Sequence, residues 1–159
     1  MESLKTGITF HDEFLKHNTG PGHPETHGRL ESILEHLSDL PSKNFLWKKD
    51  FKEAPLSIIS TIHDPNYIRL VGRTCEEKGS GYLDGDTVFS PHSYLAASLA
   101  VGAGLYLADQ VLLGNLKNGM ALVRPRRITR SLTMQWVFVF LIILRSLQNT
   151  YNPKESNAF

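Results

Sequence analysis

Asn118-Gly119-Met120-Ala121-Leu122-Val123-Arg124-Pro125 is the stretch that decides the fold of this 159-residue chain. Its pattern predicts a turn, then a short buried strand that ends at a proline. In α/β folds, ligands and reacting groups lie just past the carboxyl end of such a strand. The residues that follow Pro125 should therefore decide what this protein does.

The residues before this stretch predict alternating strands and helices. Strands are expected at 8–11, 56–62 and 119–123, and helices at about 24–39, from 64 onward and at about 90–113. Asp64 and Ser90 are capping residues, each followed by a proline that suits a first helical turn. The last helix has a face of small residues that would let it lie close to a sheet, namely Ala96, Ala97, Ala100, Ala103, Gly104 and Ala108. The order β-α-β-α-α-β predicts a layered α/β domain with a mostly parallel sheet.

The charge of the chain changes abruptly near Arg124. The formal net charge is +1, which gives no general attraction to nucleic acid. Residues 1–123 carry 11 basic and 15 acidic side chains, a net −4, whereas residues 124–159 carry six basic and one acidic, a net +5. All 12 glycines lie at or before Gly119.

A single cysteine and a polar N-terminus unlike a signal peptide predict a cytoplasmic protein, with the nucleus open if the source is eukaryotic.

Four segments, in matching order and spacing, resemble the histone deacetylase family of zinc-dependent amidohydrolases, which includes acetylpolyamine amidohydrolases and acetoin-utilisation proteins. They are Gly20-Pro21-Gly22-His23-Pro24-Glu25 with Arg29-Leu30, Ile62-His63-Asp64-Pro65-Asn66-Tyr67-Ile68, Leu83-Asp84-Gly85-Asp86-Thr87 with Ser90-Pro91 and Ser93, and Ala121-Leu122-Val123-Arg124-Pro125. The resemblance covers about residues 7–125. It implies an incomplete three-layer α/β/α sandwich of the arginase/deacetylase type and a family reaction that deacetylates acetyl-lysine or acetylpolyamine.

The resemblance also implies two substrate-binding residues. Asp86 matches the family's rim aspartate, which holds the substrate backbone, although Asp84-Gly85-Asp86-Thr87 is equally good turn chemistry. Arg29 matches a buried arginine near the pocket floor, and the alternative is an arginine on a helix surface. His23-Pro24-Glu25-Thr26-His27 differs from the helical His-Glu-x-x-His zinc motif because Pro24 intervenes, so a loop at the rim of the site is expected there.

The chain departs from the family directly after Pro125. The family continues with Pro-Gly-His-His-Ala, whose paired histidines serve a zinc-bound water, and later supplies an Asp-x-His pair and a second Asp as zinc ligands. This chain continues with Arg126-Arg127-Ile128-Thr129, its last histidine is His92, and it contains no Asp-x-His. Catalytic zinc needs at least three protein ligands. We therefore expect no catalytic residue, metal or cofactor in this chain, and uncertain status as an enzyme.

Residues 126–159 have the properties of a shifted reading frame. When the third base of each codon is read with the first two bases of the next, Met134-Gln135 must give alanine and Trp136-Val137 must give glycine. The other codons between Arg127 and Tyr151 permit His-His-Ala-Glu-Pro-Asp-Asn-Ala-Met-Gly-Phe-Cys-Phe-Phe-Asn-Asn-Ile-Ala-Ile-Ala-Ala-Lys-Tyr-Leu-Gln, which is the family's catalytic loop and following helix. Loss of one cytosine in the proline codons before Arg126 would produce this shift.

Two interpretations of the chain follow. In the first, residues 1–125 are the N-terminal part of a deacetylase domain, truncated and inactive, and residues 126–159 are an out-of-frame tail without an evolved fold. In the second, the chain is an interaction module that binds a partner or a membrane surface through its basic-apolar tail. The apolar run 136–144 is too short to span a membrane and favours aggregation.

Overall fold

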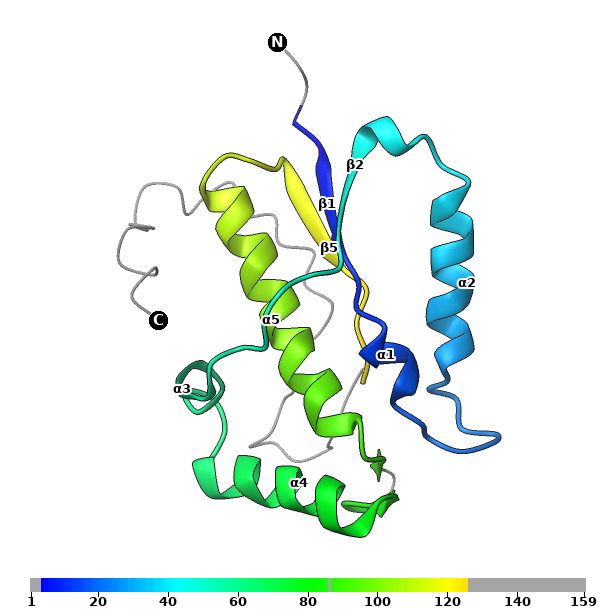
Figure 1. The fold of residues 1–159 in the computed structure, drawn as a ribbon, viewed down its shortest axis with the longest axis vertical. Coiled ribbons are helices and arrows are strands. Elements are labelled where there is room, and N and C mark those ends of the chain that lie inside the picture. Colours follow the sequence, from blue (N-terminus) through cyan, green and yellow to red (C-terminus); the bar gives the residue numbers. More distant parts are fainter. Residues whose placement is uncertain (1–3, 86, 126–159) are drawn as a thin grey trace.

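The computed structural model describes residues 4–85 and 87–125. Asp86 and the predicted tail at 126–159 therefore lie outside the described residues. The elements are β1 (Thr6–Thr9), α1 (Glu13–Lys16), α2 (His27–Ser38), the 3-10 turn η1 (Ser42–Asn44), β2 (Phe45–Lys48), α3 (Leu56–Ile59), α4 (Pro65–Lys78), β3 (Gly81–Tyr82), β4 (Val88–Phe89), α5 (Ser93–Leu112) and β5 (Asn118–Ala121). Figure 1 shows their arrangement.

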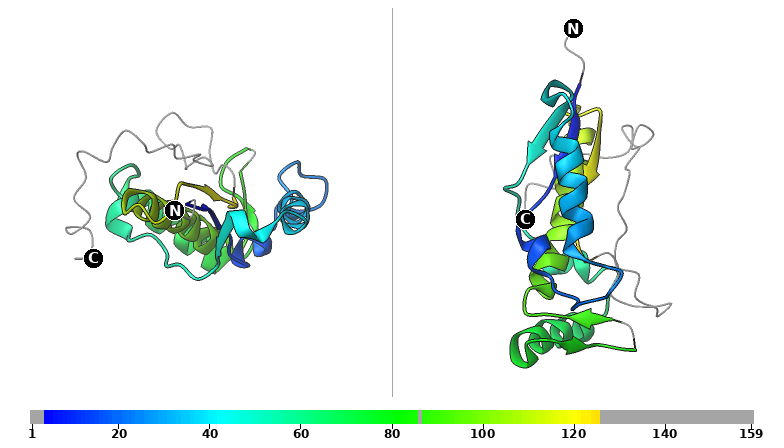
Figure 2. Two further views of the ribbon diagram at one scale, coloured as in Figure 1. Left: turned by 90° about the horizontal axis from the view of Figure 1, so that it is seen from above. Right: turned by 90° about the vertical axis from the view of Figure 1, so that its right-hand side faces the viewer.

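A parallel sheet with the strand order β2-β1-β5 forms the centre of the fold. Ile8 of β1 is level with Trp47 of β2 and Met120 of β5. Helix α5 covers one face of this sheet and α2 lies across the other, as the two views of Figure 2 show. The predicted α/β architecture with helices on both sides of a mostly parallel sheet is thus confirmed. A separate antiparallel pair, β3-β4, lies beyond α5 next to α4.

Close packing of α5 on the sheet depends on glycines in both partners. Gly7 and Gly119 are level with each other in β1 and β5, and a Cβ on either residue would come within 2.8 Å of Leu107 of α5. Gly102 of α5 lies still closer to the segment after β2, because a Cβ there would be 2.0 Å from the backbone oxygen of Lys52. The close approach of α5 to the sheet thus places Leu107 against Gly7 and Gly119.

The predicted strand at 56–62 is wrong, because α3 occupies Leu56–Ile59. Pro55 starts a helical turn in which the amides of Ile59 and Ser60 donate to the carbonyls of Pro55 and Leu56. A short isoleucine-rich run cannot be assigned by periodicity alone, and only Ile59 of this helix is buried. The second strand of the sheet is instead β2, which the sequence analysis missed.

Helix starts were predicted with mixed success. Asp64 caps α4 as expected, since its Oδ1 accepts the Asn66 amide hydrogen at 2.6 Å, and Pro65 occupies the first turn. Ser90 does not cap α5, which begins at Ser93 after His92. The Ser90 amide donates to Ser93 Oγ at 2.7 Å instead, so this serine pair belongs to a turn before the helix.

Of the described helices, one, α5, is long and apolar enough to cross a membrane by length and composition, with a mean hydropathy of 1.5. In this fold, 44% of that helical stretch is buried inside the protein. Ala103, Leu107 and Val111 pack with Ala121 of β5 in one core cluster. The apolar composition of α5 is therefore that of a helix packed on a sheet.

Replacing Gly102 by alanine should destabilise the fold by about 3 kcal/mol, because the new methyl group meets backbone at Lys52 that has no rotamer with which to move away. Gly104→Ala, two residues later in the same helix, has no atom within 4 Å of the new Cβ and should stabilise by about 0.5–1 kcal/mol through helix propensity. Urea unfolding of the two variants checks this pair. Equal effects would contradict the packing described for α5.

Candidate functional site

The carboxyl ends of β1 and β5 lie side by side because these strands are parallel neighbours. The chain leaves β1 toward β2 on one side, while β5 lies on the other side of β1. Open α/β sheets bind ligands at the carboxyl ends of their strands. A functional site is therefore expected among the residues that follow β1 and β5.

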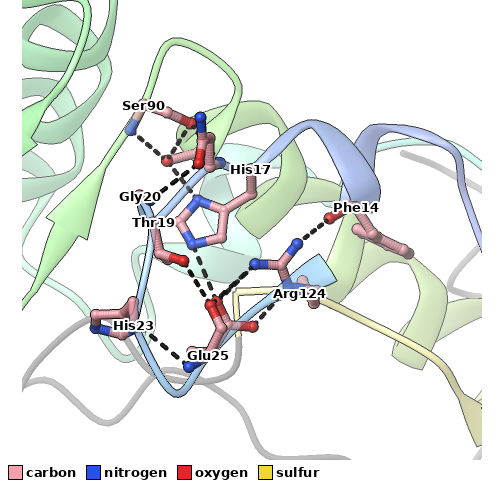
Figure 3. A network of polar contacts seen from close by, with 10 residues as sticks. Phe14, His17, Thr19, Gly20, His23, Glu25, Ser90 and Arg124 are labelled. Atoms are coloured by element: carbon pink, nitrogen blue, oxygen red, sulfur yellow. Dashed lines mark hydrogen bonds and ion pairs between the residues drawn. The ribbon is translucent and has the colours of Figure 1, made fainter. Parts of the chain in front are cut away.

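Arg124 fills this position with a buried positive charge, and its side chain is 4% exposed. Figure 3 shows the guanidinium bound side-on to the carboxylate of Glu25, with Nε 2.6 Å from Oε1 and Nη2 2.8 Å from Oε2. Nη1 also donates to the carbonyl oxygen of Phe14 in α1 at 3.1 Å. Two-point pairing of this kind fixes orientation as well as charge. It ties the end of β5 to the loop before α2 and to α1.

His17 links this ion pair to the start of α5. The ring is buried, with Nε2 3.5 Å from Glu25 Oε2 and Nδ1 2.7 Å from Ser93 Oγ. Ser93 Oγ accepts the Ser90 amide hydrogen, so its own proton is available for His17 Nδ1. In the neutral ring this leaves the proton on Nε2, which faces the Glu25 carboxylate. The donors and acceptors of the chain Ser90–Ser93–His17–Glu25–Arg124 are therefore consistent from end to end.

The acidity of Glu25 reflects two opposing effects. Burial alone would raise the pKa of this carboxyl, but hydrogen bonds from Arg124 and then His17 outweigh it and lower the pKa from 4.5 to about 2. Glu25 is thus ionised at neutral pH and balances the buried guanidinium. A buried charge needs such a partner because an uncompensated one costs several kcal/mol.

The polar side chains of this network bind one another rather than a ligand, so we call the network closed. Ser93, His17 and Glu25 resemble a serine–histidine–acid triad in composition. Ser93 is only 1% exposed, however, and its oxygen is held by the Ser90 amide. No substrate reaches the hydroxyl in this arrangement. The network positions the strand end and the loop at 17–26, and it leaves chemistry to other residues.

The residues singled out in the sequence do not gather in this network. Asp86 lies outside the described residues, so its role stays a prediction. Arg29 is exposed on α2 rather than buried, so it matches the alternative of a surface arginine, and substrate binding by it stays a prediction. His23 lies in the expected loop, where its Nδ1 accepts the Glu25 amide hydrogen at 3.1 Å. Within residues 4–85 and 87–125, no three His, Cys, Asp or Glu side chains are placed to hold a metal ion.

Sequence reasoning missed His17 and Ser93 and did not pair Glu25 with Arg124. One signal was present, since Arg124 directly follows an apolar strand and a buried arginine requires a carboxylate partner. Nothing local identifies Glu25 as that partner, because the two residues are 99 positions apart.

Glu25→Gln should destabilise the protein at pH 7 by about 3 kcal/mol or more, because it leaves Arg124 buried without a counter-charge. In the wild type, the folded-state pKa lies below the unfolded value, so the stabilisation by Glu25 is complete above pH 4.5. It should be lost as the pH falls from 4.5 to about 2, by on the order of 3 kcal/mol.

Denaturant titrations at several pH values test this, with Glu31→Gln as the control because Glu31 is exposed on α2. The control should change stability by less than about 0.5 kcal/mol. The ion pair would be shown to be unimportant if Glu25→Gln left both the stability and its decline at acid pH unchanged.

Comparisons with known proteins identify relatives of this α/β domain. A family model described as the histone deacetylase domain matches residues 23–127. A probable deacetylase of Archaeoglobus fulgidus is 33% identical over 125 residues, which cover 77% of this chain and 34% of that protein. An uncharacterised protein of Synechocystis is 40% identical over 111 residues, covering 66% of this chain and 35% of its own length. Human polyamine deacetylase HDAC10 is 35% identical over 103 residues, covering 61% of this chain and 15% of its own length.

The crystal structure of the HDA15 HD domain superposes with a TM-score of 0.69 at 29% identity, covering 78% of this chain and 36% of that one. The chain thus spans about a third of the length of the Archaeoglobus and Synechocystis relatives and of this structure. The matches include the Glu25 and Arg124 segments that hold the end of β5 in place. On these grounds the chain belongs to the histone deacetylase family.

Proposed function

We propose that residues 1–125 are the N-terminal part of a histone-deacetylase-like zinc amidohydrolase and that this chain does not catalyse the family reaction. That reaction is the hydrolytic deacetylation of acetyl-lysine or acetylpolyamine. The observation that carries the proposal is the absence of any histidine after His92, so the strand ending at Arg124-Pro125 is followed by no histidine that could serve as general base or ligand.

Zinc is implied by the family, and the described residues do not fit it. Glu25 is engaged by Arg124, His17 lies between Glu25 and Ser93, and His23 accepts a backbone hydrogen bond in its loop. These side chains satisfy one another and leave no open set of three ligands. No step of a zinc-dependent reaction is therefore assigned to them.

The proposed boundary near Pro125 has two independent supports. The family match ends at residue 127. The codons required at Met134-Gln135 and Trp136-Val137 agree with the family's own sequence in the neighbouring frame. Both observations favour residues 126–159 as a tail translated out of frame.

Purified full-length chain, supplied with zinc, should release no acetate above the buffer level from an acetyl-lysine peptide or from an acetylpolyamine. The reason is the lack of the histidine pair and of the Asp-x-His pair. The control is the coding DNA with one cytosine restored before the codon of Arg126, which should encode the histidine pair in frame. Zinc-dependent release of acetate by the unaltered 159-residue chain would overturn the proposal.

A second candidate function rests on the tail sequence. Arg126, Arg127 and Arg130 precede the apolar run at 136–144, a combination that favours anionic membrane surfaces. Co-sedimentation with anionic liposomes, lost when residues 126–159 are deleted and when salt is raised, would support this function. Equal sedimentation with neutral and anionic vesicles would indicate aggregation of the apolar run instead.

A further inference from the structure

A hollow of about 480 Å³ lies between the segments that follow β1 and β2 and the first turns of α5. It is lined by His11, Glu13, Phe51, Lys52, Glu53, Leu95 and Leu99. It is wide open to solvent and lies at the carboxyl ends of two parallel strands, where α/β folds bind ligands. None of Arg124, Glu25 or His17 contributes to it.

Part of this hollow is apolar. Leu95 and Leu99 contribute aliphatic surface from α5. Phe51 adds an aromatic ring, against which the ring of His11 packs edge-on with 5.8 Å between centroids. A surface of this composition suits an aliphatic or aromatic group of a few carbon atoms.

The polar groups of the hollow fall into two sets. Glu13 is already satisfied, because Lys16 and His92 bind its two oxygens. His11 Nδ1 accepts the Glu13 amide hydrogen at 3.1 Å, so the proton of the neutral ring is on Nε2 and makes that atom a donor. Lys52 and Glu53 are exposed, and neither side chain has a hydrogen bond or ion pair with another described residue. The hollow thus offers a cation with a neutral donor and, separately, a carboxylate.

We propose that this hollow binds a free α-amino acid with an apolar side chain. The ligand carboxylate faces Lys52 and the His11 Nε2–H, its ammonium faces Glu53, and its side chain lies on Phe51, Leu95 and Leu99. Opposite charges on one small molecule match the two free charges of the hollow. A phosphate would be opposed by Glu53 and Glu13, and a neutral hydrocarbon would leave Lys52 and Glu53 without partners. The proposal does not depend on the deacetylase reaction.

Titration of the full chain with L-leucine, followed by backbone amide shifts at residues 51–53 and 95, tests the site. Lys52→Gln and Glu53→Gln should each weaken leucine binding roughly two- to fivefold, as expected for exposed charge pairs. Lys49→Gln is the matched control, since Lys49 lies over the ring of Phe10 and does not line the hollow. It should leave leucine binding unchanged.

Two analogues separate the two ends of the ligand. Lys52→Gln should weaken 4-methylpentanoate, which lacks the ammonium group, and leave 3-methylbutylamine unaffected, whereas Glu53→Gln should do the reverse. Both analogues should bind more weakly than leucine. The proposal is overturned if leucine produces no saturable shifts, if 4-methylpentanoate binds as tightly as leucine, or if neither charge variant changes leucine affinity.

Discussion

A buried guanidinium must keep its counter-charge, and this requirement organises one end of the fold. Arg124 closes β5, yet three of its hydrogen bonds reach Glu25 and a fourth reaches the carbonyl of Phe14. The loop at 17–26 is therefore held at the strand end although it contains Gly20 and Gly22 with positive φ. Thr19 Oγ1 adds a bond to the Glu25 carbonyl at 2.6 Å. The bonds of Arg124 thus link the strand end, the loop and α1.

The hydrogen-bonded network around the ion pair can reach α5 because that helix lies so close to the sheet. Gly7, Gly119 and Gly102 remove the side chains that would hold the helix away. The N-terminal end of α5 then brings Ser93 to 2.7 Å from His17, which in turn faces Glu25. Apolar packing on one face of the sheet and the polar network at its edge are thus two consequences of the same close approach.

Features with a local cause could be predicted from the sequence, whereas those that depend on distant partners could not. The cap at Asp64, the helices α2, α4 and α5, and the strand at β5 follow from spacing, capping residues and turn residues. The prediction of a strand at 56–62 was wrong because the four apolar residues of this run suit a helical turn as well as a strand. The pairing of Glu25 with Arg124 spans 99 residues, so no local pattern contains it. The family resemblance implied that Arg29 is buried. The structure places it on the exposed surface of α2, which favours the alternative of a surface arginine.

The closed network separates holding the strand end from performing a reaction there. The polar side-chain atoms of Arg124, Glu25 and His17 bind one another, Ser93 or the backbone. These residues therefore position the backbone that leaves β5 and do not supply a reactive group. A reactive group at this edge has to come from residues outside this network, and the sequence contains no histidine after His92. The packing of α5 and the ion pair therefore depend on other residues than any reaction at this edge, because a fold and the site it carries depend on different residues.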